Sequence, residues 1–310
     1  MKDIDGGITA PKGFKAGTAG CGIKYTDRDD LAVIASDSPA ACAGMFTTNR
    51  IQGAPVVVSR ENVKHGIARA IVATSGNANV CTGDDGHKAA MLMTREIAGH
   101  LGCDSQEVLV ASTGIIGRPF PVKKALAGIP SAIGALSADG GHAAARAIMT
   151  TDTVPKETAV EIDIGGVPVR IGAIAKGSGM ISPNMATMFC FITTDAVITP
   201  GALSSALKSA VARSFNCITV DGDMSTSDTV LILANGEAGN KQIGSYRESL
   251  TVFTEALYEV CLRMAKAIVR DGEGATRFVT ITVDGADTSE NARRVGLAIA
   301  NSALVKTAVF

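Results

Sequence analysis

The clearest pattern of apolar and polar positions lies at residues 158–175, TAVEIDIGGVPVRIGAIA. Apolar residues alternate with polar ones on both sides of Gly165-Gly166, which predicts two antiparallel strands joined by a tight turn. Apolar runs bounded by turn residues predict further strands. These strands are expected at 31–37, 53–61, from 67 onward, 107–113, 217–223 and 277–285.

Apolar residues at helical spacing predict helices between these strands. The helices are expected at about 86–101, twice within 122–149, at 200–214, 247–270 and 289–303. Thr199 is suited to cap the helix that begins at Pro200. Helices and strands alternate without repeats or low-complexity segments. The pattern therefore predicts an α/β (α+β) protein with layered mixed β-sheets flanked by helices.

The composition favours an enzyme-like globular chain. Of 310 residues, 46% are hydrophobic but only 4% aromatic, so the core is expected to consist of small aliphatic side chains. A net charge of −1 and the absence of long Lys/Arg runs argue against nucleic acid or an anionic membrane surface as partner. No apolar stretch reaches the roughly 18–20 residues of a membrane span, and the N-terminus has no apolar signal segment. We expect a cytoplasmic protein.

Cysteine and histidine give no sign of a metal site. The seven cysteines form no CxxC pair, and we expect them to be reduced, small core residues. The four histidines lie in no ligand spacing, so no metal is predicted.

The stretch with the most chemistry is 176–196, KGSGMISPNMATMFCFITTDA. A glycine-rich turn precedes Ala186-Thr187, and an apolar strand follows. We predict that the chain cuts itself between these two residues: the Thr187 hydroxyl attacks the Ala186 carbonyl, and water hydrolyses the resulting ester. The new α-amine, which titrates near ~7.7–8.0, would then serve as the general base for its own hydroxyl. The alternative interpretation is an ordinary strand threonine.

A second candidate lies where the predicted strand 107–113 ends in Ser-Thr-Gly. The Thr113 hydroxyl and the Gly114 N–H could together form an oxyanion site, which needs two converging donors. The small polar residues at 74–86 are either a turn or a binding loop.

Residues 176–196 closely resemble the signature of the ornithine acetyltransferase / glutamate N-acetyltransferase family of arginine biosynthesis. Further stretches resemble blocks of the same family in the same order, so the resemblance covers essentially the whole chain. These blocks are 6–16, 36–50, 74–86, 111–117, 149–153, 216–229 and 271–276. The resemblance implies a DmpA/ornithine acetyltransferase-like fold and autocatalytic cleavage into an α chain, 1–186, and a β chain, 187–310.

The resemblance also implies the reaction and its residues. Thr187 would take the acetyl group of N-acetylornithine, release ornithine and pass the acetyl group to glutamate. Thr113 and Gly114 match the family's oxyanion donors. Thr150, Lys176, Thr187 and Glu273 match its substrate-binding positions. A lysine suits an amino-acid carboxylate and a glutamate suits an amine, although alone they would be interpreted as a solvated turn lysine and a surface charge.

Other properties implied by the resemblance are an α₂β₂ heterotetramer, no bound cofactor, and acetyl-CoA as an additional donor in some members. Relative to the family, the chain is expected to lack a C-terminal part that carries further substrate-binding residues, an Asn and a Ser or Thr. The chain also ends on an apolar, strand-like run at Phe310. Two alternatives stay open: an N-terminal-threonine amidase or aminopeptidase, and an inactive, unprocessed binding scaffold.

Overall fold

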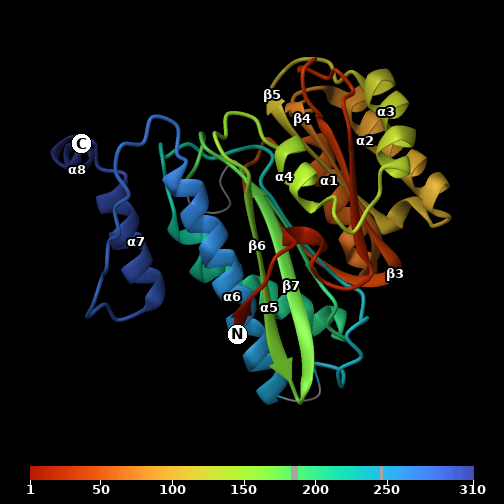
Figure 1. The fold of residues 1–310 in the computed structure, drawn as a ribbon. Helices are drawn as coiled ribbons and strands as arrows, with labels where there is room; N and C mark the ends of the chain where they lie inside the picture. The colour runs from red at the N-terminus through yellow and green to blue at the C-terminus, as the bar shows by residue number, and fades with distance from the viewer. Residues whose placement is uncertain (183–187, 245–246) are drawn as a thin grey trace.

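The computed structural model describes residues 1–182, 188–244 and 247–310. In this part of the chain one nine-stranded sheet has the order β1-β6-β7-β8-β9-β3-β4-β5, with β2 paired to β3 (Figure 1). The strands are β1 Lys2–Asp3, β2 Phe14–Ala19, β3 Leu31–Phe46, β4 Ile67–Asn77, β5 Val108–Ile115, β6 Lys156–Ile164, β7 Val167–Lys176, β8 Phe189–Thr194 and β9 Thr229–Ala234.

Helices follow or connect most of these strands. They are α1 Ala54–Asn62, α2 Gly83–Leu101, α3 Val122–Gly134, α4 Gly141–Ala147, α5 Pro200–Arg213, α6 Arg247–Arg270, α7 Ser289–Ala300 and α8 Ala303–Val309. Short 3-10 turns are at Gly7–Thr9, Val63–His65, Ser105–Glu107 and Phe215–Cys217. Within the described ranges, no helix combines the length and the apolar character needed to cross a membrane.

Strand β3 divides the sheet into two halves. Its first part pairs with β4 and its second part, 41–46, pairs with β9, and the register shifts between Ala35 and Ala40. We call β2, β4, β5 and the first part of β3 the first half-sheet. The second half-sheet comprises β1, β6–β9 and the second part of β3. A bulge of this kind bends a strand, so the two halves need not lie in one plane.

The two half-sheets cover one another. A single buried cluster contains Ile71 and Leu109 of the first half-sheet together with Ile174, Phe189 and Leu231 of the second. The helix in this cluster, α4, has only seven residues, about 10 Å of length, too short to cover so many strands. The sheet must therefore fold back so that its halves enclose this cluster, which we call the interlayer core.

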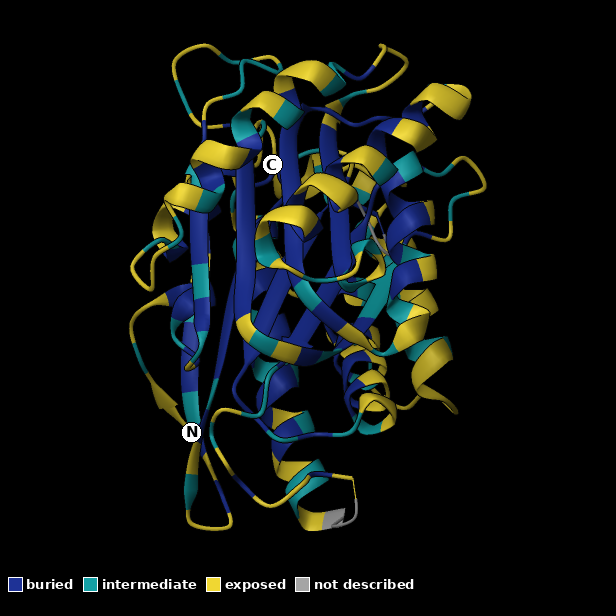
Figure 2. Cartoon of the chain, turned by 90° about the vertical axis from the view of Figure 1, so that its right-hand side faces the viewer, coloured by how far each residue is buried: buried dark blue, intermediate teal, exposed yellow. Residues whose placement is uncertain are grey.

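Helices cover the outer faces. A second buried cluster joins β6–β9 to α5 and α6, and a third joins the first half-sheet to α1, α2 and α3. The strands are consequently buried while the helices keep an exposed side (Figure 2). The architecture is four-layered, α/β/β/α, which confirms the predicted layered α/β class. The predicted hairpin is also confirmed, with Ile164 opposite Val167, and Thr199 accepts the Ala202 N–H as predicted.

The strand predicted at 53–61 is wrong, because these residues form α1. Helix α1 packs against the edge strand β5 and hydrogen-bonds to its backbone. Ser59 Oγ donates to Val110 O at 2.6 Å and accepts from Val110 N at 2.7 Å. Asn62 Nδ2 donates to Val108 O at 2.8 Å. These polar contacts to an unpaired strand edge outweigh the β preference of the valines.

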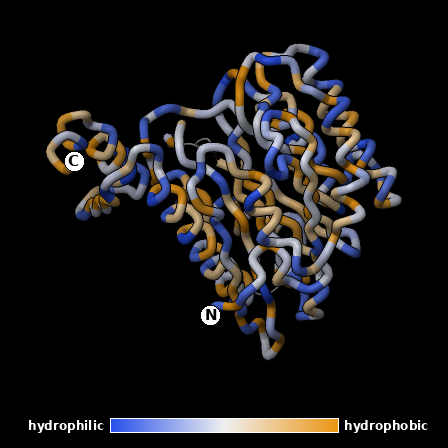
Figure 3. Tube along the Cα trace, turned by 45° about the horizontal axis from the view of Figure 1, so that its top comes forward, coloured by the Kyte–Doolittle hydropathy of each residue, from blue (hydrophilic) through white to orange (hydrophobic). Residues whose placement is uncertain are grey.

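Two other predicted strands are also wrong. Residues 217–223 and 277–285 form no strand, and both contribute residues to one cavity of about 390 Å³ that α7 also lines. Their β-branched residues have no neighbouring strand among the described residues, and a strand without pairing is not stable. The strand-like C-terminal run is helix α8, at the end of the chain marked C in Figure 3. Its Leu304 is exposed.

The seven cysteines divide into three groups by burial, of which Cys21 and Cys103 form the partly buried one. Cys42, Cys190 and Cys261 are buried, and burial raises the pKa of the Cys42 and Cys261 thiols to about 12, so they are unreactive at neutral pH. Cys81 and Cys217 are exposed. The expectation of core residues was wrong for these two.

Candidate active site

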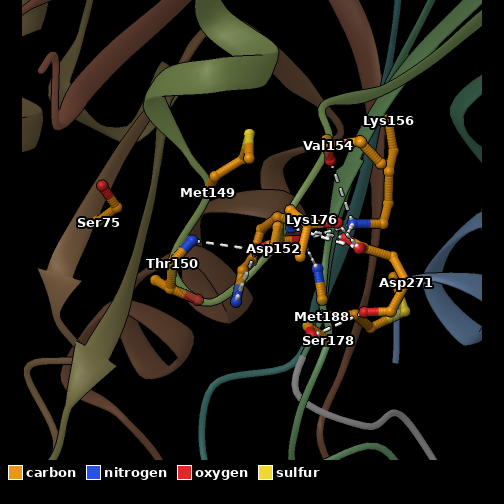
Figure 4. Close-up of polar contacts among 12 residues, drawn as sticks. Ser75, Met149, Thr150, Asp152, Val154, Lys156, Lys176, Ser178, Met188 and Asp271 are labelled. Atoms are coloured by element: carbon orange, nitrogen blue, oxygen red, sulfur yellow. Dashed lines mark hydrogen bonds and ion pairs between the residues drawn. The ribbon is translucent and has the colours of Figure 1, made fainter. Parts of the chain in front are cut away.

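Three polar residues continue the apolar rows of the interlayer core. Lys176 is two residues after Ile174 in β7, and Thr113 and Ser75 follow core residues of β5 and β4 at the same spacing. Because side chains two apart in a strand share a face, all three are directed between the half-sheets. Ser75 Oγ donates at 2.8 Å to the carbonyl oxygen of Ala147, the last residue of α4. In the view of Figure 4, Thr150, which follows this helix, is drawn between Ser75 and Lys176.

Lys176 belongs to a network of buried charges. Lys156 Nζ lies 2.7 Å from Asp152 Oδ1 and 2.6 Å from Asp271 Oδ2, and Lys176 Nζ lies 4.0 Å from Asp152 Oδ2 (Figure 4). The side chains of Asp152, Lys156 and Lys176 are at most 2% exposed. The interpretation of Lys176 as a solvated turn lysine is therefore wrong.

Charge and burial oppose each other in this network. Burial alone would raise the pKa of Asp152, but Lys176, Lys156 and the Gly177 N–H, which donates at 2.6 Å, hold it below its usual range. Burial lowers the pKa of Lys176, opposed by the carboxylates of Asp152 and Asp228. Lys176 is thus a buried cation beside Asp152, and Asp152 is already paired with Lys156.

The network also positions the other predicted substrate residues. Thr150 N donates to Asp152 Oδ2 at 3.0 Å, and Glu273 N donates to Ser178 O at 2.9 Å. The carboxylate of Glu273 lies against Gly179, where an added Cβ would be 2.6 Å from Oε2. The structure thus brings Thr150, Lys176 and Glu273 to one place, with Lys176 buried and Glu273 exposed.

Thr113 and Gly114 lie at the end of β5, on the first half-sheet. Thr113 is 3% exposed, and its hydroxyl has no hydrogen-bond partner in the part of the chain that is described. Gly114 has φ +133°, and an added Cβ would lie 2.3 Å from the carbonyl carbon of Gly76. Only glycine fits this position, so the backbone here is held rigidly against β4.

Ala186 and Thr187 lie outside the described residues, but the start of β8 is defined. Met188 N donates to Asp228 Oδ1 at 3.0 Å, and Thr229 N donates to Met188 O at 3.1 Å. Lys176 is paired with Phe189 across β7 and β8. The residue that follows Thr187 is thus anchored beside Lys176.

Sequence reasoning missed Asp152, Lys156 and Asp228. Asp152 and Asp228 lie inside two of the family-like blocks, 149–153 and 216–229. Their place in these blocks was the sequence signal by which they could have been predicted. Lys156 has no such signal. Among the described residues, no group of three His, Cys, Asp or Glu side chains is placed to hold a metal ion.

Comparison with known proteins gives a consistent result. The model of the ArgJ family matches residues 15–310. The arginine biosynthesis bifunctional protein ArgJ of Symbiobacterium thermophilum is 51% identical over 312 residues, covering 100% of this chain and 78% of that protein. The protein of the same name from Geobacter sulfurreducens is 49% identical over 96% of this chain and 76% of that protein.

Solved structures agree. The crystal structure of arginine biosynthesis bifunctional protein ArgJ from Bacillus halodurans matches with a TM-score of 0.56 and 38% identity, over 59% of this chain and 97% of that one. The crystal structure of ornithine acetyltransferase from Mycobacterium tuberculosis, solved with ornithine, matches with a TM-score of 0.54 and 38% identity. The match covers 57% of this chain and 94% of that one.

A β-aminopeptidase from Burkholderia, at 15% identity and a TM-score of 0.56 over 88% of each chain, shows likeness of fold alone. The sequence matches, by contrast, extend over nearly the whole chain at about half identity. This chain therefore belongs to the ArgJ family.

Proposed function

We propose that this chain transfers an acetyl group from N-acetylornithine to glutamate through an acetyl-Thr187 intermediate. Its membership of the ArgJ family makes it an acetyltransferase of arginine biosynthesis. The observation that supports the proposed site best is the convergence of Lys176 and Thr113 on one interlayer space beside the anchored start of β8.

Both half-reactions of the proposed cycle use the same three groups: Thr187, Thr113 and Gly114. The Thr187 hydroxyl attacks the acetyl carbonyl, and its α-amine accepts the hydroxyl proton and then protonates the departing ornithine amine. Thr113 Oγ–H and Gly114 N–H stabilise the oxyanion. The amine of glutamate then attacks the acetyl-Thr187 ester. The α-amine of Thr187 accepts the proton that the attacking nitrogen loses and returns it to Thr187 Oγ as N-acetylglutamate is released.

The charged groups suit amino-acid substrates. Lys176 would bind the α-carboxylate, because Asp152 is already held by Lys156 and by two backbone N–H groups. Glu273 would bind a substrate amine from the exposed side. Thr150, whose N–H is used by Asp152, would offer its hydroxyl to the substrate.

Cleavage at 186–187 would leave the two products interlocked. Strands β8 and β9, which follow the cut, pair with β7 on one side and β3 on the other, and both of these precede it. The α chain, 1–186, and the β chain, 187–310, would thus share one sheet. We further propose that two such pairs assemble as α₂β₂ and that acetyl-CoA can serve as a second donor in the absence of any bound cofactor.

The test is an acetyl-transfer assay with purified protein. N-acetylornithine and glutamate should give ornithine and N-acetylglutamate, and Thr187→Ala should abolish the reaction and leave one uncut chain. Thr307→Ala, an exposed threonine of α8 that bonds only to its own helix, serves as the control and should behave as wild type. Transfer by Thr187→Ala at the wild-type rate would refute the nucleophile. Hydrolysis of N-acetylornithine without transfer would instead favour the amidase alternative.

A further inference from the structure

Unsatisfied polar atoms concentrate beside the start of β8. Some buried side-chain atoms of the described residues have no hydrogen-bond partner. Three of these atoms belong to consecutive residues: Thr226 Oγ1, Ser227 Oγ and Asp228 Oδ2. Asp228 is 0% exposed. Native proteins leave few buried polar groups unpaired, because each costs about 1–3 kcal/mol, and more for a carboxylate. A buried carboxylate oxygen without a partner therefore calls for a functional explanation.

Asp228 is not a loosely placed loop residue. Thr47 N donates to Asp228 O at 3.0 Å, Gly53 N donates to Thr226 O at 2.9 Å, and Thr47 Oγ1 donates to Ser225 O at 2.7 Å. These bonds fix the backbone on both sides of the unpaired atoms. The carboxylate cannot relieve its unpaired oxygen by turning outward with the loop.

The other oxygen shows what the carboxylate faces. Asp228 Oδ1 accepts the Met188 N–H at 3.0 Å. Three covalent bonds separate this nitrogen from the nitrogen of residue 187, so the two nitrogens lie within roughly 4 Å of each other at any backbone dihedral. The α-amine released by cleavage would thus form within about 7 Å of Asp228 Oδ1, so that the free terminus could turn toward the unpaired Oδ2.

We infer that Asp228 is a positioning residue, whose free carboxylate oxygen accepts a hydrogen bond from the α-amine that cleavage creates on Thr187. This inference rests on the proposed self-cleavage. Before the cut, the oxygen has no partner among the described residues; after it, the amine supplies one. An amine held by one N–H keeps its lone pair in a fixed direction, which is what a general base acting on its own hydroxyl needs.

Two further groups bear on Asp228. Burial raises the pKa of Asp228 well above its usual range, opposed by the Met188 N–H, the Ser225 hydroxyl and the charge of Lys176. None of these groups is hydrogen-bonded to Oδ2. Both protonation states retain an oxygen that can accept from the amine. An asparagine NH₂ group in place of Oδ2 could not accept a hydrogen bond from the N–H of the Thr187 amine. The amine would then lose the contact that fixes its orientation.

The experiment compares Asp228→Asn with wild type in cleavage, kcat and KM. The asparagine oxygen can still accept from Met188 N, so we expect cleavage and a near-normal KM, with kcat lowered about 10²-fold, the usual cost of a misplaced catalytic group. Asp228→Ser, which also lacks the carboxylate, provides a second variant if Asp228→Asn does not fold.

The control is Asp195→Asn at the other end of β8. Asp195 is equally buried, but both of its oxygens accept backbone N–H groups, from Lys12 at 3.2 Å and Arg170 at 2.7 Å. The Asp195→Asn substitution should lower the melting temperature, because it disturbs these two hydrogen bonds, while kcat stays near that of wild type.

Wild-type kcat in cleaved Asp228→Asn would overturn the inference but leave the proposed function intact. An uncleaved Asp228→Asn would overturn it too, because the carboxylate would then be needed before the amine exists. A wild-type chain that is neither cut nor active would overturn the proposed function first and this inference with it.

Discussion

The two sides of the site are built in different ways. On the first half-sheet, Thr113 and Gly114 owe their position to the backbone pairing of β4 with β5. On the second half-sheet, Lys176 owes its position to a network of four buried or nearly buried charges. A group that stabilises a transient oxyanion needs fixed geometry, which a strand provides. A group that binds a carboxylate needs a desolvated charge, which only counter-charges can maintain.

The difference predicts where each side is vulnerable. Removing a hydroxyl from the first side should affect the reaction and leave the fold intact. Removing a charge from the second side should affect the fold, because the partner that remains is buried without compensation.

The largest effect is expected for Lys156→Met. The ammonium of Lys156 is the close partner of both Asp152 and Asp271, and breaking buried pairs of this kind costs about 3–5 kcal/mol. Urea denaturation should show this loss in the free energy of unfolding. Arg213→Met is the control, since its ion pair with Glu255 is about half exposed and should contribute at most about 1 kcal/mol. Equal stability of the two variants would show that the network is not a structural unit.

A smaller, purely kinetic effect is expected for Thr113→Ala. Loss of one oxyanion donor should lower kcat by about 10²–10³. The melting temperature should stay near that of wild type, because the hydroxyl has no partner among the described residues to lose. Steady-state kinetics together with a thermal melt measure both. An unchanged kcat would remove Thr113 from the site.

The smallest effect is expected for Lys176→Arg, which keeps the charge but changes its pKa. Burial lowers the pKa of Lys176, so its ammonium should lose a proton as the pH rises through this lowered value. Above it, the neutral amine would no longer attract a carboxylate, and the KM for glutamate should increase. Arginine stays protonated, so the KM of Lys176→Arg should remain flat over the same alkaline range. Parallel KM profiles for the two proteins would contradict a carboxylate-binding role.

Patterns in the sequence predicted the elements whose partners are local or whose faces are fully buried. The hairpin of β6 and β7 is an example, because alternation and Gly165-Gly166 are both intrinsic to the segment. Sequence patterns failed where contacts between residues far apart in the chain determine the secondary structure. Ser59 and Asn62 make α1 a helix only because β5 offers an open edge.

The same division holds for the site. Family-like blocks pointed to Thr113, Gly114, Thr150, Lys176 and Glu273, and the structure gathers three of these around residues 176–179. Nothing local marks Lys156 as the cation that holds Asp152, since the pair depends on how β6 enters the sheet. Asp228 becomes a candidate only when its unpaired oxygen and the Met188 N–H are seen together.

The central claim is that Thr187 carries the acetyl group. The most direct measurement is to mix the purified chain with N-acetylornithine in the absence of glutamate, quench it with acid and determine the mass of the peptide that starts at Thr187. We predict that this peptide is heavier by one acetyl group and that the added mass disappears when glutamate is supplied. A peptide that begins before residue 187, or one that starts at Thr187 but never gains the acetyl group, would contradict the account.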